Sequence, residues 1–253
     1  MNPVSIIITG YHGQFDNIAI LLLLISIYFF LNTKISLLYK YISILLISAS
    51  GFVIKHIILF PLFAFYLTIS KSLSKALFFT FFALIFFLIS FIPFISSAKQ
   101  QIISNVFNYK SMEGLYGISY FLMKYCPNIS LTQNSIIVRN IFLILGICYI
   151  TVFPKKDLIQ SLLVAILFFL TFTSGIGGQY FLLPIAFASL RPSKMFYIYS
   201  FIVSLFYLGN SWEFNITFFK FISWNVVWLF ILLWFILENY LLFQKNFKRD
   251  KRI

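Results

Sequence analysis

The chain has 253 residues, of which 61% are hydrophobic and only 10% are charged, and its formal net charge is +13. A soluble domain carries about a quarter charged residues, so this composition excludes an ordinary soluble globular protein. The basic residues lie in short segments between long apolar runs. This pattern is typical of membrane topology and excludes a nucleic-acid-binding role for the charge.

Long apolar runs follow one another along the chain. They predict an all-α fold, a polytopic transmembrane helical bundle of about nine membrane helices, with a range of about 8–10. We expect a single transmembrane domain over residues 1–253. The predicted helices cover residues 17–33, 38–55, 57–70, 75–96, 135–153, 157–174, 179–190, 195–210 and 222–244.

Two of these runs, at 57–70 and 179–190, are shorter than the roughly 20 residues that cross a hydrocarbon layer about 30 Å thick. Each contains a proline, Pro61 in the first and Pro184 in the second. We therefore expect these segments to be kinked, to re-enter the side from which they came, or to extend further than their hydropathy indicates.

The distribution of lysine and arginine predicts the orientation of the bundle. A basic tail at residues 245–253 places the carboxyl terminus in the cytosol. Threading back through the predicted helices puts thirteen of the nineteen basic residues on the cytosolic side. The N-terminal segment 1–16 and a long loop at 97–134 then lie outside. The predicted location is the cell or inner membrane of a bacterium, or the endoplasmic reticulum of a eukaryote.

The densest polar string lies directly before the first apolar run, and its members are Tyr11, His12, Gln14 and Asp16. Polar and ionisable groups are costly beside the hydrocarbon layer, so such a cluster indicates a site. Asp16 has a structural alternative, because an aspartate at this position also caps the free amide groups of the following helix.

A second polar pair, Lys55 and His56, follows the run at 38–55 on the same predicted outer side. An ammonium group and an imidazole are suited to a phosphate at the membrane surface. The structural alternatives are a lysine that snorkels to the interface and a histidine that forms a packing hydrogen bond between helices.

Signatures of other chemistry are missing from the sequence. It contains no Gly-rich phosphate loop, no Gly-x-Ser-x-Gly turn and no Cys-x-x-Cys pair. The two cysteines and two histidines lack the spacing of a zinc site, so no metal ligands are predicted. The identity of any cofactor, including a divalent metal, stays open.

Four short motifs follow one another along the chain. They are Pro3 with Gly13-Gln14-Phe15-Asp16, Lys55-His56 with Pro61, residues 105–117, and residues 175–184. They occur in the order seen in multispan glycosyltransferases of the GT-C superfamily, whose segments can be written P…GQFD, KH…P, VF-Y…G-WG and G-G-QY…P. The chain resembles the mannosyltransferase-like members.

The resemblance implies an integral-membrane enzyme that takes a hexose from a polyprenyl-phosphate donor on the extracytoplasmic face. The acceptor is a glycan, a lipid or a protein. Within the outer loop, Tyr109 and Lys110 would belong to a flap over the donor. The structural alternative is that Lys110 and Glu113, three residues apart, form a pair on one helix. The resemblance implies substrate-binding roles for Tyr11, His12, Gln14, Asp16, Lys55, His56, Tyr109, Lys110 and Gln179.

One feature of the family is missing from the chain. These enzymes resemble one another in a catalytic Asp on an early outer loop, and no residue of this sequence matches that Asp. The GQFD segment normally follows several spans, whereas here it begins near residue 10. The chain therefore resembles such an enzyme without its N-terminal third. We expect a fragment, or a short protein whose partner chain supplies the missing helices and carboxylate. Asp16 is the remaining candidate for a catalytic base.

Other functions stay open beside this one. A polysaccharide polymerase or ligase also uses polyprenyl-linked substrates and a large outer loop, and the GQFD-like string favours the glycosyltransferase over it. A non-catalytic protein that binds or transports lipid-linked sugars is the further alternative. Transport predicts polar residues deep within several spans, and the middles of the predicted spans are almost entirely apolar.

Overall fold

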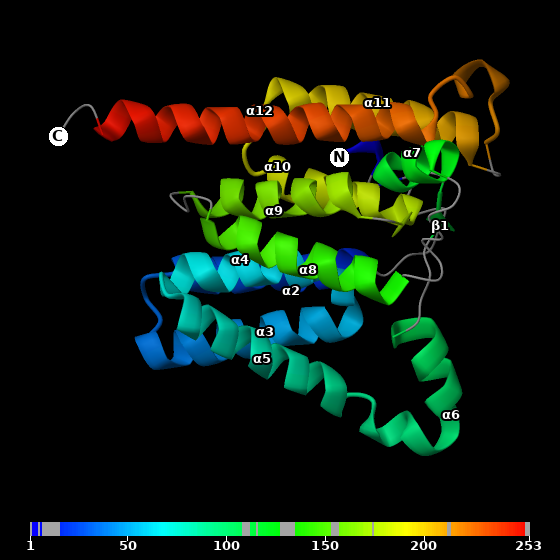
Figure 1. Cartoon of the computed structure of the whole chain (residues 1–253). Coiled ribbons are helices and arrows are strands. Elements are labelled where there is room, and N and C mark those ends of the chain that lie inside the picture. Colours follow the sequence, from blue (N-terminus) through cyan, green and yellow to red (C-terminus); the bar gives the residue numbers. More distant parts are fainter. Residues whose placement is uncertain are drawn as a thin grey trace. The chain divides into compact units, whose positions relative to one another are not determined.

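The computed structural model (Figure 1) confirms the predicted all-α class, because almost all of its regular structure is helical. It forms two compact units, which are described separately below: an N-terminal unit of residues 14–110, and a C-terminal unit of residues 111–253 together with residues 1–13. The structure describes residues 2–4, 6, 16–107, 112–114, 116–126, 135–152, 157–173, 175–211 and 214–250.

The N-terminal unit is a packed set of helices and short helical turns. Its elements are α2 (Asp16–Leu31), α3 (Leu37–Ile54), the 3-10 turn η1 (His56–Ile58), α4 (Leu59–Ser70), α5 (Leu73–Ile89), the 3-10 turn η2 (Ile92–Phe94), α6 (Ile95–Ile102) and the π-helical turn η3 (Ile103–Phe107).

Close packing of α2 against α3 depends on Gly51. A methyl group at this position would lie 3.0 Å from the Ala19 carbonyl oxygen, so glycine lets the two backbones approach. Helix α4 packs against α5, and nine of its twelve residues are buried. The Ser48 hydroxyl lies 2.7 Å from the Tyr66 hydroxyl and links α3 to this buried helix.

The C-terminal unit contains most of the remaining helices and the two short strands. Its elements are β1 (Met112–Glu113), α7 (Gly117–Tyr125), α8 (Ser135–Val152), α9 (Leu158–Phe172), β2 (Gly175–Ile176), the 3-10 turn η4 (Gly178–Leu182), α10 (Leu183–Ala188), α11 (Lys194–Asn210), the 3-10 turn η5 (Thr217–Phe219) and α12 (Trp224–Asp250).

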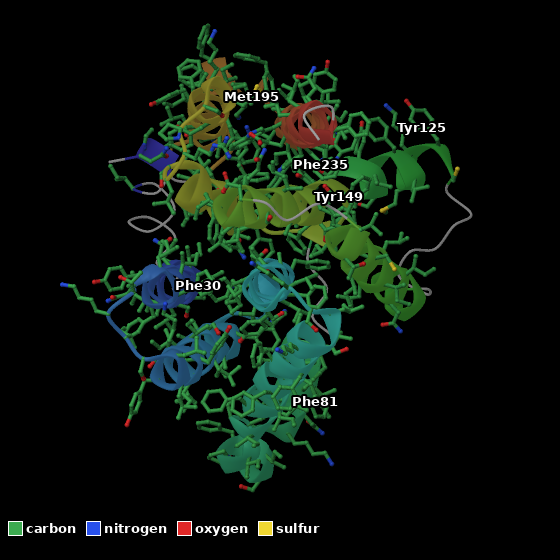
Figure 2. All side chains as sticks on the ribbon, turned by 90° about the vertical axis from the view of Figure 1, so that its left-hand side faces the viewer. Phe30, Phe81, Tyr125, Tyr149, Met195 and Phe235 are labelled. Carbon is green, nitrogen blue, oxygen red and sulfur yellow. The ribbon has the colours of Figure 1, made fainter. Side chains whose placement is uncertain are left out.

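The core of this unit lies around α9, in which ten of fifteen residues are buried. Aromatic contacts join its helices: the rings of Tyr149 on α8 and Phe235 on α12 have centroids 5.5 Å apart (Figure 2). Trp234 is fully buried beside Tyr199 of α11, with ring centroids 5.2 Å apart. The amide of Asn2 donates a hydrogen bond of 2.8 Å to Ser200, which ties the start of the chain to α11.

Three helices of the described chain are long and apolar enough to cross a membrane, and several shorter apolar helices accompany them. These three support a membrane protein, whereas the count of nine spans stays a prediction. Exposed aromatic side chains such as Phe81 on α5 (Figure 2) are suited to lipid. The three long segments are Leu37–Ile54, which is α3; Leu73–Ile102, which combines α5, η2 and α6; and Trp224–Gln244, which lies within α12.

The structure differs from the sequence prediction around the segment 75–96. Helix α5 ends at Ile89, and the chain turns before η2 because Pro93 lacks an amide donor and cannot continue the preceding helix. The loop predicted at 97–134 is largely helical where it is described, since it holds most of α6, all of η3 and α7.

Candidate functional site

A short antiparallel ladder joins two segments that the sequence motifs singled out. Strand β1 pairs with β2 so that Met112 faces Ile176 and Glu113 faces Gly175. The predicted outer loop and the Gly-rich segment, about sixty residues apart in the chain, therefore meet within the C-terminal unit. We call the region formed by β1, β2, η4 and the start of α7 the platform.

The turn between β1 and α7 needs glycine at two positions. Gly114 and Gly117 have φ values of +78° and +59°, a region that side-chain-bearing residues rarely adopt. A methyl group on Gly117 would also lie 2.7 Å from Nε1 of Trp228. The Gly117 amide donates to Asn225 Oδ1 at 3.3 Å, so α7 begins in direct contact with the first turn of α12.

Two aromatic side chains hold the end of α9 against the platform. The Tyr116 hydroxyl donates to the Leu170 carbonyl at 2.8 Å, and Trp228 Nε1 donates to the Thr171 carbonyl at 2.9 Å. The Thr173 hydroxyl donates to the Gly175 carbonyl at 2.9 Å and fixes the entry into β2. Helix ends leave such carbonyls without partners, so these bonds stabilise the turn.

The predicted site residue Gln179 lies in η4, within the platform. A methyl group on Gly177 would lie 2.5 Å from Gln179 Oε1, which shows that the glutamine side chain folds back over the Gly177 backbone. Gly178 lies against the Tyr207 hydroxyl in a similar way, because a methyl group on Gly178 would lie 2.9 Å from the hydroxyl oxygen. The Gly-rich segment is therefore a tight turn whose glycines make room for neighbouring polar groups.

The predicted phosphate ligands Lys55 and His56 lie where α3 ends in the N-terminal unit. Lys55 has an extended backbone and donates its amide to the Gly51 carbonyl at 3.0 Å, and His56 begins η1. His56 is exposed, yet its ring lies 6.4 Å from that of Phe87. Desolvation by apolar neighbours lowers the pKa of His56, and the charge of Lys55 lowers it further.

The backbone places Asp16 at the same end of the N-terminal unit as this pair. Asp16 is the first residue of α2, and the contact of Gly51 with Ala19 brings the start of α2 beside the end of α3. The packing of α2 against α3 therefore places Asp16, the last residue of the GQFD motif, at the same end of this helix pair as Lys55 and His56.

Several predicted site residues lie outside the described part of the structure. Their roles stay predictions, as does that of the Asp16 side chain. These residues are Tyr11, His12, Gln14, Tyr109 and Lys110. Among the residues that the structure describes, no group of three His, Cys, Asp or Glu is arranged to hold a metal ion.

A polar network that the sequence motifs did not indicate crosses three segments of the C-terminal unit. Gln160 is 3% exposed and donates to Glu238 Oε2 at 2.9 Å, and Trp234 Nε1 donates to Glu238 Oε1 at 3.3 Å. Arg191 donates to Gln160 Oε1 at 3.2 Å and pairs with Asp157 at 2.5 Å. The polar Gln160 and Glu238 within apolar runs were the sequence signal for this network.

Replacing Glu238 with leucine is expected to lower the free energy of unfolding by about 1–3 kcal/mol, because the amide of Gln160 and the indole of Trp234 lose their acceptor. Glu238→Gln keeps an acceptor oxygen and should cost less. Unfolding in mixed micelles measures both. Gln244→Leu, on the exposed part of the same helix, is the control, and an equal loss in it would contradict a specific role for the network.

No family model matches the chain, and no curated protein and no solved structure shows significant similarity to it. The functional conclusion therefore depends on the motifs and on the geometry above.

Proposed function

We propose that the protein is an integral-membrane glycosyltransferase that transfers a hexose from a polyprenyl-phosphate donor on the extracytoplasmic face of the membrane. The observation that carries the proposal is the pairing of β1 with β2, because it brings the second half of the outer-loop motif, at Gly114 and Gly117, beside the Gly-rich motif, and both resemble segments of GT-C enzymes. The position of Asp16 beside the end of α3 supports it in the N-terminal unit.

The chemistry of the proposed reaction assigns roles to Lys55, His56 and Asp16. An acceptor hydroxyl oxygen attacks the anomeric carbon of the hexose, and the bond from that carbon to the phosphate oxygen breaks. Polyprenyl phosphate leaves with the bonding electrons, and Lys55 and His56 stabilise its charge. A base takes the hydroxyl proton, and Asp16 holds that role in the proposal.

A transfer assay tests the proposal. The full chain, reconstituted in liposomes, receives polyprenyl-phosphate mannose or glucose that is radiolabelled in the sugar, together with a total lipid and glycan extract as acceptor. We expect label to leave the donor and appear in a new product. Hydrolysis or retention of both donors without a labelled product, by a folded chain, would contradict the proposal.

One observation favours a second candidate, the transport of lipid-linked sugars. Helices α4 and α10 are short and buried, each follows a 3-10 turn, and each has a proline near its start. Interrupted helices of this kind line substrate sites in many transporters. Movement of a fluorescent lipid-linked sugar between leaflets, without any new glycoside, would favour transport over transfer.

A further inference from the structure

One end of the N-terminal unit carries four lysines on two neighbouring turns. The turn from α2 to α3 and the turn from α4 to α5 lie at the same end of the unit, on the left in Figure 1. Ring contacts join the helices there, with Tyr41 of α3 6.1 Å from Phe79 of α5. We call this the lysine end, and its members are Lys34, Lys40, Lys71 and Lys75.

The charge of the lysine end is not compensated within the unit. The sequence has no Asp or Glu between residues 17 and 112, and in the described part of the chain none of the four lysines belongs to a salt bridge. Helices α3 and α5 both begin here without an acidic residue in the first turn and without a side-chain cap from Ser36 or Ser72. Their amino-terminal dipoles add to the positive potential.

An apolar collar adjoins these lysines. It is strongly exposed, and Tyr39 and Phe78 are 69% and 64% accessible. Apolar and aromatic groups of this kind lie in the outer part of a bilayer, and neighbouring lysines then reach the headgroups. The collar consists of Leu37, Leu38, Tyr39, Leu73, Leu77 and Phe78.

Lys71 stands in a backbone conformation that does not favour lysine. Its φ is +52° at the carboxyl end of α4, where glycine or asparagine is the usual residue. The Ser70 hydroxyl donates to the Ser72 carbonyl at 3.0 Å and holds this turn. The turn projects an exposed lysine between two helix ends, although a glycine would be less strained there.

We propose that the lysine end binds the phosphate groups of anionic lipid headgroups. Membrane lipid is the occupant because the exposed apolar collar needs the hydrocarbon layer directly beside the charges, which a soluble anion does not supply. The proposal rests on the membrane location of the chain and is independent of sugar transfer, so either can fail while the other holds.

Native mass spectrometry of the detergent-solubilised full chain tests the proposal. It measures how much phosphatidylglycerol is retained relative to phosphatidylcholine of the same acyl chains. We expect the wild type to prefer phosphatidylglycerol. Each lysine near an anionic lipid surface changes the binding constant for that surface about fivefold. The paired variants K34Q/K40Q and K71Q/K75Q should therefore each lower the preference for phosphatidylglycerol over phosphatidylcholine about tenfold or more. The matched control is K99Q/K220Q, which removes two exposed lysines from outside the lysine end.

Three results would overturn the proposal. They are equal retention of both lipids by the wild type, an equal loss of preference in the control pair, and saturable binding of soluble glycerol phosphate without a preference for phosphatidylglycerol. The first two exclude a local site, and the third identifies a site for a soluble anion.

Lys71→Gly separates the charge from the backbone. Glycine relieves the positive φ, so the melting temperature should stay equal or rise, while the preference for phosphatidylglycerol falls. A lower melting temperature with unchanged lipid preference would show that Lys71 acts in the fold and would remove it from the proposed site.

Discussion

The double substitution of Lys55 and His56 by glutamine is expected to reduce sugar transfer about a hundredfold or more. Hydrogen bonds to a charged partner contribute roughly 1.5–3 kcal/mol each, and the donor phosphate would lose two of them. Both residues lie at the break between α3 and η1, where the helix ends and the side chains are at least partly accessible. The measurement is the initial rate of label transfer from the polyprenyl-phosphate hexose.

The control for this prediction is Lys99→Gln, which removes an exposed positive charge from α6 of the same unit. It should leave the transfer rate within about twofold, because α4, α5 and η2 separate Lys99 from Lys55 and His56 along the chain and Lys99 has no proposed role at the phosphate. A double variant that is folded and transfers sugar at the wild-type rate would refute the assignment of Lys55 and His56 to the phosphate.

The pH dependence of stability gives a second readout for His56. Its pKa is lowered from the ordinary value of 6.5 in the folded chain, so the unfolded chain binds more protons between the two pKa values. The contribution of His56 to the free energy of unfolding is fully present above pH 6.5, and it is lost as the pH falls through the pKa of His56 in the folded chain. Because His56 is exposed, we expect a small slope that His56→Gln abolishes.

Gly117→Ala is expected to lower the free energy of unfolding of the C-terminal unit by about 2–5 kcal/mol. A left-handed backbone costs a residue with a Cβ about 1–2 kcal/mol, and overpacking adds about 1–3 kcal/mol. Both effects apply here, because the new methyl group would lie 2.7 Å from the Trp228 indole nitrogen. Indole fluorescence during unfolding in micelles measures the loss.

Gly177→Ala is the matched control for this substitution within the same platform. Its φ is −105°, and the nearest atom to a new methyl group is the free end of the Gln179 side chain, which can rotate away. The expected loss is under about 1 kcal/mol. Equal losses at Gly117 and Gly177 would show that the left-handed turn and the indole contact do not determine the stability of the platform.

Helices that coincide with one continuous apolar run were predictable from the sequence. The run at 38–55 became Leu37–Ile54, and the run at 195–210 became Lys194–Asn210. Helix α7 was missed because it has only nine residues, and serine and lysine interrupt its apolar side chains. Short helices have weak periodicity, and their stability comes from packing that the sequence does not display.

The candidate site was predictable as a set of motifs but not as an assembly. Glu113 pairs with Gly175 in strands of only two residues each. Such short strands show no alternation of apolar and polar residues from which a strand could be predicted. The bonds from Tyr116 and Trp228 to the end of α9 join residues more than fifty positions apart. Such contacts depend on how helices pack, and hydropathy alone carries no information about the partner of a tyrosine or a tryptophan.

Helix α9 has fifteen residues, so its axis is about 22 Å long, several ångströms shorter than a hydrocarbon layer of about 30 Å. A helix that stops inside this layer leaves carbonyl groups far from water, and Tyr116 and Trp228 supply the donors that water would otherwise provide. If α9 crosses the bilayer, the platform is therefore recessed below the headgroups. The proposed lipid-linked donor would then enter sideways from the leaflet, without passing through bulk water.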